Sequence, residues 1–419
     1  MKYVNYIESS ENRVFTDRNN FDYLVKSNGF RHSNIDAFKN AINVSSLRYS
    51  FYLYALYENE TIQEDLSSYL TEDGQLTVNL ESGIRRRLNV TLYNKENWLP
   101  SPVRGFLWKG AKFKLEIGVK TTLAEYIYPA GVFVLNEFEM PHTYVKNTIT
   151  LDMVDKFGAL DGTVGGKIIS AINIPVGSKI FDAIKTLLSG YKIHGIPYDV
   201  KKIRFPLKFL NATTSYTITK TLDSGGSIGE LLKELAMMIN QDVFYDEYGN
   251  LCFCDMQENI VKNTSASVWS FYDTDADYVS PVAKINLQSV KNVVTVQGAN
   301  INGNLIDVTV QNNNPKSITN ITIFEPTPIR IIDENITSIK YAKERANYEL
   351  IKNSLLSVSM NFNTLIIPLL DVGNVIEITD SYFKFKAERF IINSISIPIN
   401  SVGKMSLSIN NLEEVGFNG

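Results

Sequence analysis

Alternating apolar and polar residues between positions 76 and 153 constrain the fold of this chain more than any other feature of its sequence. Leu88, Val90 and Leu92 alternate with polar neighbours, and residues 113–119 and 145–151 show the same pattern. A period of two residues places all the apolar side chains of a segment on one face of a β-strand. Roughly five such strands within about 80 residues predict antiparallel pairing in a barrel or sandwich.

Helical spacing replaces this alternation between residues 156 and 280. Ser227 and Glu230 form a capping box at the start of an apolar stripe that ends at Ile239. A second helix is predicted after Ser178, which would be its cap. The apolar residues on one side of this helix are Ile180, Phe181, Ile184, Leu187 and Leu188. Two strands joined by a turn are predicted for residues 242–253, so this part of the chain is expected to form a small α/β domain.

Alternation returns in residues 281–419. Residues 293–298 and 305–310 flank an Asn302-Gly303 turn, which predicts a β-hairpin, and one helix is expected over residues 339–352. The chain is therefore predicted to be mainly β with an α+β insert. In this prediction two tube-like antiparallel β-barrels flank the small α/β domain, and the four regions are residues 1–75 (a separate N-terminal region), 76–155 (first barrel), 156–280 (α/β domain) and 281–419 (second barrel with one helix).

Charge and hydrophobicity argue against two broad classes of protein. The chain of 419 residues has a formal net charge of −4, whereas a nucleic-acid-binding protein usually carries a basic face. The cluster from Arg85 to Arg87 is interpreted as part of a solvated or interface strand rather than as a phosphate site. No apolar run approaches the roughly 18 residues of a membrane span, and the N-terminus lacks the apolar segment of a secretion signal. We therefore expect neither stable nucleic-acid binding nor a membrane span. We expect the protein to be assembled in a cytoplasm.

Cysteine and histidine supply no predicted metal site. Cys252 and Cys254 share one face of a predicted strand, where the geometry suits a disulfide poorly and no histidine is near in sequence. We interpret them as two small core residues in a reducing compartment. The three histidines are far apart in the sequence: His32, His142 and His194.

Two glycine-rich segments suggest phosphate binding but lack the pattern it needs. Only three residues separate Gly162 from the Gly166-Lys167 pair, and Ile168 follows where serine or threonine would hold magnesium. Residues 225–229 lead into a helix N-terminus, which can bind an anion. We interpret the first segment as a flexible turn and the second as a loop that lets the capped helix start at a sharp angle.

Carboxylate pairs are the remaining candidates for chemistry. Asp273, Asp275 and Asp277 could ligate calcium, but the glycine and the twelfth-position glutamate of an EF-hand loop are missing. Glu137 and Glu139 lie on one predicted strand face and could imitate a glycosidase pair; we interpret them as a solvated or channel-lining face. No catalytic, cofactor-binding or metal-binding residue is predicted, no cofactor is expected, and the chain is predicted not to be an enzyme.

Several segments, taken in order, resemble a known protein family. Residues 87–94 (RLNVTLYN), 128–135 (YPAGVFVL) and 150–162 (TLDMVDKFGALDG) follow one another as in the baseplate hub proteins of phages that infect Gram-positive bacteria and of related prophage-derived particles. Residues 226–253 resemble the α/β insert of these proteins. Residues 341–346, followed by 371–378, resemble the late-control protein D class, to which T-even phage hubs are related. The resemblance runs from about residue 76 to the C-terminus, and the preceding region is interpreted as particle-specific.

This resemblance implies a structural protein of the virion tail or baseplate, assembled in the cytoplasm of the host bacterium. It implies a homotrimer in which each subunit contributes two tube-like barrels, so that a pseudo-sixfold ring joins the sixfold tail tube to a threefold spike and lines the channel for DNA or the tape-measure protein. The implied partners are the tail tube or distal tail protein, the central spike or tail-tip protein, the tape-measure protein and other baseplate proteins. No catalytic residue is implied.

Two other functions stay open at this point. One is a tail-associated cell-wall hydrolase. The other is a receptor-binding adhesin, for which the 22 tyrosine and 22 phenylalanine residues are the motivation, because aromatic side chains can stack on sugars.

Overall fold

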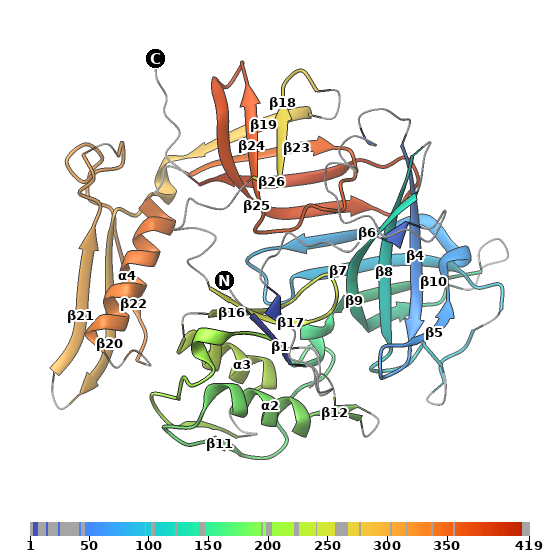
Figure 1. Cartoon of the computed structure of the whole chain (residues 1–419), viewed down its shortest axis with the longest axis horizontal. Helices are drawn as coiled ribbons and strands as arrows, with labels where there is room; N and C mark the ends of the chain where they lie inside the picture. Colours follow the sequence, from blue (N-terminus) through green and yellow to red (C-terminus); the bar gives the residue numbers. More distant parts are fainter. Residues whose placement is uncertain are drawn as a thin grey trace. The chain divides into compact units, whose positions relative to one another are not determined.

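The computed structural model divides the chain into two compact units. Unit 1 comprises Met1–Cys254, Leu365–Leu369 and Ile395–Met405, and unit 2 comprises Asp255–Thr364, Leu370–Ser394 and Ser406–Gly419. Most of the described secondary structure is β-strand, as predicted (Figure 1). The structure describes residues 3–6, 14–15, 24–25, 42, 47–96, 98–101, 105–121, 125–141, 147–193, 196–197, 203–221, 226–239, 241–255, 267–275, 278–301, 304–315, 317–334, 336, 338–354 and 357–412.

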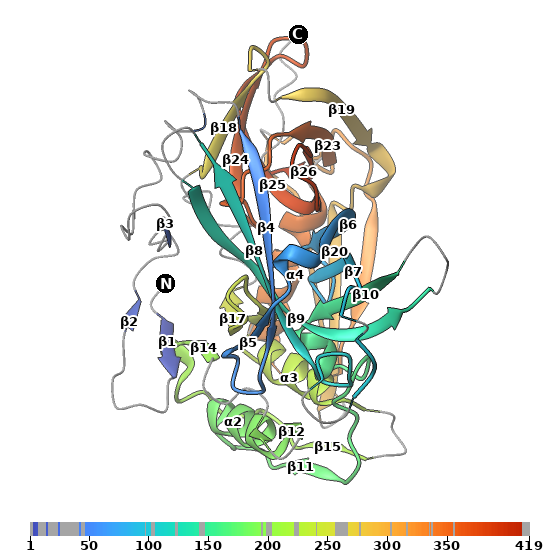
Figure 2. The same ribbon diagram turned by 90° about the vertical axis from the view of Figure 1, so that its right-hand side faces the viewer.

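The main sheet of unit 1 is antiparallel and confirms the predicted strands. Its strand order is β6–β7–β10–β9–β8–β4–β5, and β4 and β8 run side by side along their whole length (Figure 2). Leu88, Val90 and Leu92 in β7 are fully buried, as the alternation predicts. The strands are β4 (Arg48–Leu56), β5 (Ile62–Asp65), β6 (Leu70–Asn79), β7 (Arg86–Tyr93), β8 (Lys112–Lys120), β9 (Glu125–Glu139) and β10 (Thr148–Asp155), with the short helix η1 (Ser67–Tyr69) before β6 and β3 (Leu24–Val25) paired to β9.

Strands from the predicted N-terminal region belong to this sheet. The sequence assigns residues 1–75 to a region of their own, but β4, β5 and the start of β6 precede residue 76 and pair within the main sheet. No described sheet closes on itself, so the predicted barrels are not confirmed. Alternation decides which face of a strand is buried, whereas closure depends on strand tilt and stagger, which the pattern does not encode.

Unit 1 also contains the predicted α/β elements. The helices α2 (Ile180–Gly190) and α3 (Ile228–Met237) accompany a sheet in the order β16–β17–β14–β1–β2, where β14 and β17 are parallel. The strands are β1 (Tyr3–Tyr6), β2 (Val14–Phe15), β14 (Ile203–Pro206), β16 (Gln241–Tyr245) and β17 (Leu251–Asp255). Smaller elements are η2 (Lys156–Ala159), β11 (Ile172–Ile174) paired with β15 (Ile218–Lys220), β12 (Lys192–Ile193) paired with β13 (Ile196–Pro197), and η3 (Leu207–Phe209).

Of the two predicted helix N-caps, one is confirmed and one is wrong. The capping box is confirmed, because Ser227 Oγ accepts from the Glu230 amide (3.1 Å) and Glu230 Oε2 accepts from the Ser227 amide (3.3 Å). The apolar side of α2 is buried as predicted, but the predicted cap is wrong. Lys179 occupies the cap position, and the Ser178 hydroxyl instead donates to the Pro175 carbonyl (2.7 Å).

The main sheet of unit 2 packs around aromatic side chains. β23, β26 and β25 follow the outer strand β19, and β24 pairs with β25 and, in parallel, with β18. The ring of Phe362 lies 5.0 Å, centroid to centroid, from the rings of both Phe271 and Tyr278 in this core. The strands are β18 (Trp269–Tyr272), β19 (Val279–Asn286), β23 (Ser357–Thr364), β24 (Val375–Asp380), β25 (Phe385–Pro398) and β26 (Met405–Asn411), with η5 (Leu287–Ser289) after β19.

A second, smaller sheet of unit 2 contains the predicted hairpin. β20 (Val293–Ile301) pairs antiparallel with β21 (Asn304–Gln311) and in parallel with β22 (Pro328–Ile332). The helix α4 (Ile339–Ser354) covers one face, where Ala342 and Ala346 pack against Val294 and Val296 (Figure 1). The sequence places this hairpin within the second barrel, whereas the structure gives it a sheet of its own. The turn residues Asn302 and Gly303 lie outside the described residues.

Candidate assembly surfaces

The outer strand of the main sheet in unit 2 is an exposed pairing edge. Among the described strands, β19 pairs only with β23. Val282 and Ile285 on β19 are 63% and 46% exposed, and Leu287, directly after the strand, is 61% exposed. Pro281 removes one hydrogen-bond donor from this edge. Such an apolar edge is a template for pairing with another chain, and proline and charge limit where that pairing occurs.

The outer strand of unit 1 differs in charge. β5 pairs only with β4 in the described part of the chain. Ile62 is 56% exposed, and Glu64 and Asp65 follow it on the same short strand. Burial and, secondarily, the negative charge of Glu96 raise the pKa of Glu64. The edge of unit 1 is therefore acidic, whereas the edge of unit 2 carries Lys284.

The solvent side of the main sheet in unit 1, which we call the charged face, gathers three carboxylates. Glu137 and Glu139 on β9 are both exposed, and they lie opposite Asp152 and Thr150 of β10. Asp152 accepts a hydrogen bond from the Asn136 amide (2.8 Å). The charged face comprises Arg87, Asn89 and Thr91 on β7, Thr150 and Asp152 on β10, and Glu137 and Glu139 on β9. Glu137 and Glu139 are exposed on this sheet face, as the solvated interpretation expects.

On the corresponding side of the main sheet in unit 2, β23, β25 and β26 carry hydroxyl and amide side chains, and we call this surface the neutral face. Lys284 of the outer strand β19 borders it, opposite Ser359. The alternate residues of the same strands are buried, among them Met360, Phe362 and Leu407. The Ser406 hydroxyl donates to Asn363 Oδ1 (2.6 Å), so the polar groups of neighbouring strands satisfy one another. The neutral face comprises Ser359, Asn361 and Asn363 on β23, Ser394 on β25, and Ser406, Ser408 and Asn410 on β26.

Arginine residues join the charged face to the α/β elements. The prediction of a solvated or interface strand holds as solvated for Arg87, which is exposed, whereas Arg85 and Arg86 are not solvated, being only 6% and 2% exposed. Arg86 Nη1 donates to the Tyr245 carbonyl (2.9 Å). Arg85 pairs with Asp242, and its guanidinium lies 3.6 Å from the centroid of the Phe244 ring. The start of β7 is therefore fastened to β16 by charge-assisted contacts.

A buried aspartate fixes the backbone at the same junction. Asp155 is 1% exposed and accepts from the amides of Arg85 (2.7 Å), Arg86 (3.0 Å) and Phe157 (2.9 Å). Burial raises the pKa of Asp155 to about 6, although the three amides and the Arg86 charge act in the opposite direction. Desolvation outweighs these contributions because burial removes the water that would stabilise the charged carboxylate.

A fully buried lysine holds two turns against each other. Lys156 Nζ lies 2.7 Å from Glu60 Oε1 and donates to the Gly249 carbonyl (2.8 Å). Lys112 Nζ lies 3.2 Å from the same Glu60 oxygen. Glu60 has a φ of 62°, a conformation that a non-glycine residue rarely adopts. The Glu60 carboxylate thus holds the β4–β5 turn to Lys156 of η2, and Lys156 in turn contacts the β16–β17 turn.

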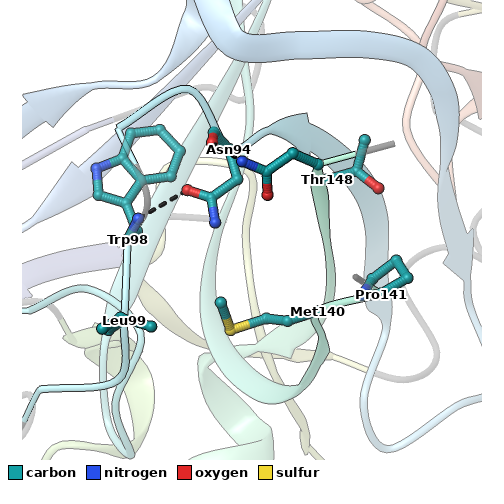
Figure 3. Close-up of a pocket in the computed structure, with 7 residues that line it drawn as sticks. Asn94, Trp98, Leu99, Met140, Pro141 and Thr148 are labelled. Carbon is teal, nitrogen blue, oxygen red and sulfur yellow. Dashed lines mark hydrogen bonds between the residues drawn. The ribbon is translucent and has the colours of Figure 1, made fainter. Parts of the chain in front are cut away.

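A small pocket lies beside the charged face, at the ends of β7, β9 and β10 (Figure 3). It encloses about 170 Å³ and is lined by Asn94, Trp98, Leu99, Met140, Pro141, Asn147 and Thr148. The Trp98 amide donates to Asn94 Oδ1 (2.7 Å), and the indole ring packs edge-on against Tyr69 and Phe106. None of these lining residues can donate or accept a proton near neutral pH, so the pocket offers contacts rather than acid–base chemistry.

Close packing constrains a glycine in each glycine-rich segment. Gly166 has a φ of 82°, and a Cβ at this position would meet the Leu160 carbonyl carbon at 2.4 Å. Gly229 at the start of α3 would likewise meet Asp161 at 2.9 Å. Close backbone packing therefore explains both glycines, and the positive φ of Gly166 fits the turn interpretation of the first segment.

The predicted aspartate cluster anchors loops. Asp273 accepts from the Ser381 amide (2.8 Å) and hydroxyl, and these hydrogen bonds lower its pKa. Asp275 accepts from the Tyr272 amide (3.0 Å). Asp277 lies outside the described residues, and among those described no group of acidic, cysteine or histidine side chains could hold a metal ion.

Cysteine and histidine complete the predicted candidates. Cys252 is buried, as expected of a core residue, and Cys254 is half-buried. The three histidines (His32, His142 and His194) lie outside the described residues. None of the described helices combines the length and the apolarity that a membrane crossing requires.

Comparison with known proteins identifies the fold. No protein-family model matches the chain, and no curated protein is similar to it in sequence. The 43 kDa tail protein of prophage MuSo2 from Shewanella oneidensis matches with a TM-score of 0.55 and 14% identity, over 86% of this chain and 98% of that chain. The tail protein of Neisseria meningitidis MC58 matches with a TM-score of 0.57 and 11% identity, over 87% and 96%. The prophage tail protein gp18 of Listeria monocytogenes EGD-e matches with a TM-score of 0.54 and 11% identity, over 87% and 95%.

The chain therefore has the fold of phage and prophage tail proteins. The resemblance to baseplate hub proteins that the sequence motifs suggest is confirmed at this level. Sequence analysis missed the buried Glu60, Lys112 and Lys156 group, because these charges are far apart along the chain. The pairing of β4 with β8, of β8 with β9 and of β9 with β10 brings them together.

Proposed function

We propose that this chain is a structural hub of a phage-type tail baseplate, a trimeric ring that joins the tail tube to the central spike. The observation that supports this most is the extent of the match to the Shewanella prophage tail protein, which covers nearly the whole of that chain. A likeness confined to one sheet would support only a shared module. Here the sheets and the α/β elements match together, as in a protein that does the same structural task.

The two exposed sheet edges support the ring. β19 offers apolar side chains and Lys284, and β5 offers Ile62 with Glu64 and Asp65. Because these edges are different surfaces of one chain, pairing between them is head-to-tail. Head-to-tail contacts close into a ring when the rotation between subunits permits it. Strand pairing across subunits would continue a sheet around such a ring.

The charged face and the neutral face support a channel. A passing polymer is released easily by a surface that holds no excess of the opposite charge. The charged face has three carboxylates and one arginine, and the residues of the neutral face carry no charge, with Lys284 of β19 at its border. The charged face would repel DNA, a polyanion, and the neutral face would bind it weakly. An extended tape-measure protein would find few ionic contacts on either face.

The proposed partners follow from this position. They are two further copies of the chain, the tail tube or distal tail protein on one side, the spike or tail-tip protein on the other, and the tape-measure protein in the channel. The proposed location is the virion tail or baseplate, with assembly in the cytoplasm of the host. The role is mechanical and not enzymatic.

Solution mass tests the proposal. Light scattering after gel filtration is expected to give about three times 47.3 kDa for the purified chain. A second sample with Val282 and Ile285 both changed to serine is expected to shift toward the monomer, because the edge loses apolar area that contact would bury. A monomeric wild-type chain at every concentration would contradict a self-assembling ring.

A further inference from the structure

The turn between β24 and β25 carries a highly exposed aromatic side chain. Tyr382 is 87% exposed, the highest value among the large hydrophobic side chains in the described part of the chain. Its ring packs edge-on against Phe383 at 5.1 Å, and the series continues through Phe385 to Phe390, which is fully buried. The exposed ring is therefore the outer end of an aromatic ladder that starts in the core of unit 2.

Hydrogen bonds keep this turn in one conformation, even though two of its residues have positive φ values. Asp273 of the neighbouring β18 end binds the amide and hydroxyl of Ser381, and Asp380 Oδ1 accepts from the Phe383 amide (3.0 Å). Lys384 and Ala387 have φ values of 57° and 54°, which non-glycine residues adopt at a cost. An exposed aromatic ring that is already ordered loses little conformational entropy when a partner covers it.

The pocket of unit 1 has the chemistry to accept a tyrosine. Figure 3 shows Asn94 and Thr148 along one side, and Leu99, Met140 and Pro141 on the other. Leu99 is 72% exposed, so the apolar side is open to a partner. A cavity of roughly 150 Å³ holds a benzene ring, which is close to the volume enclosed here. Tyrosine combines an aromatic body with a hydroxyl, and both halves find matching groups in this pocket.

Charge near the two surfaces is complementary. Lys384 and Lys386 are exposed on the tyrosine turn, where Asp273 is engaged by Ser381 and Asp380 is buried. Beside the pocket, Glu96 and Glu139 are exposed, and the pKa of Glu64 is raised by burial and by the charge of Glu96. Lys95 is the one exposed cation adjoining these described pocket residues in sequence. A basic turn would thus approach an acidic rim.

We propose that Tyr382 of one copy inserts into the pocket lined by Trp98, Leu99 and Met140 in a second copy. This rests on the proposed ring, and it specifies a contact that orients the subunits within it. Tyr382 belongs to unit 2 and the pocket belongs to unit 1. The contact is therefore head-to-tail and can repeat around a ring of three subunits. The tyrosine hydroxyl would meet the amide of Asn94, and the ring would cover Leu99.

Cysteine cross-linking tests the contact directly. Chains carrying Leu99→Cys are mixed with chains carrying Tyr382→Cys and oxidised mildly. Disulfide-linked dimers are expected in the mixture and not in either sample alone, which also controls for Cys252 and Cys254. Val402, 78% exposed, supplies the matched negative control when Val402→Cys replaces Tyr382→Cys. A yield no greater than that of this control overturns the proposal.

Assembly strength gives a second readout. Tyr382→Ala is expected to raise the dissociation constant of the trimer by about thirtyfold, the effect of losing a central aromatic anchor. Tyr382→Phe is expected to raise it by only about threefold, because it removes one hydrogen bond. Val402→Ala is expected to leave it unchanged. If the wild type forms trimers and Tyr382→Ala forms them equally well, the contact is refuted and the ring stands; if the wild type is always monomeric, the ring itself is refuted.

Discussion

The two units present similar open sheet faces but support them in different ways. In unit 1 the sheet is fastened to the α/β elements by buried charges, with Asp155, Lys156 and Arg86 each at most 2% exposed. In unit 2 the main sheet rests on aromatic rings, with Phe271 and Phe362 in contact at 5.0 Å. Buried ion pairs contribute little net stability, but they allow few alternative arrangements of the groups around them. Burial of apolar surface stabilises strongly but does not depend on the orientation of the groups in contact. We infer that buried charges fix how the sheet of unit 1 packs against the α/β elements, whereas buried apolar surface supplies most of the stability of the main sheet in unit 2.

The largest effect is expected in unit 2. Phe362→Ala should lower the free energy of unfolding by about 3–5 kcal/mol, because it leaves a cavity between Phe271 and Tyr278. Urea unfolding followed by aromatic fluorescence measures the change, with the exposed Val402→Ala as control. A loss below about 1 kcal/mol would show that the surrounding side chains collapse into the space, and would break the contrast between the units.

Removal of the shared carboxylate in unit 1 is expected to cost nearly as much. Glu60→Gln leaves Lys112 and Lys156 buried without the negative charge that both contact, which costs about 3 kcal/mol. The matched variant Lys156→Met removes one of the two cations and keeps the Glu60–Lys112 pair, so a smaller loss is expected. The same unfolding experiment compares them, and equal losses would contradict a charge-based role for Glu60.

The next largest effect is expected in the pH dependence of the stability of unit 1, through Asp155. The folded-state pKa of Asp155 is about 6, above its ordinary value of 3.8, so the folded state holds this proton more tightly than the unfolded state does. This group therefore favours folding most below about pH 4, and its contribution falls, by up to about 3 kcal/mol, as the pH rises through 6. The difference between wild type and Asp155→Asn, measured from pH 4 to 7, should show this decline. A pH-independent difference would contradict it.

The smallest effect on stability, and the clearest on function, is expected on the neutral face. Lysine at Asn361, Asn363 and Ser408 should change the free energy of unfolding by no more than about 0.5 kcal/mol per exposed site. It should nonetheless create affinity for duplex DNA that weakens steeply with salt, as phosphate contacts do. Gel-shift titration at two salt concentrations measures this, with glutamine at the same positions as control. DNA binding by the wild type would contradict a non-retaining channel surface.

Local patterns predicted the elements that depend on neighbouring residues. The alternation around Leu88, the capping box at Ser227 and the apolar side of α2 were all readable, because each is set by the geometry of a single strand or helix. The cap at Ser178 failed because its hydroxyl finds the Pro175 carbonyl instead. A serine offers several competing hydrogen bonds, and the sequence does not rank them.

The sequence by itself determined that this chain is mainly β, which faces of its strands are apolar, and that its motifs follow the order seen in baseplate hubs. Only the tertiary structure decided that residues before position 76 join the main sheet, that the hairpin around β20 has its own sheet with α4, and that Arg85 and Arg86 are buried while Arg87 is exposed. The physical reason is distance along the chain. Strand partners such as β1 and β14, and the charges on Glu60 and Lys156, meet only after segments far apart in sequence are brought together, and no local periodicity records which segments those are.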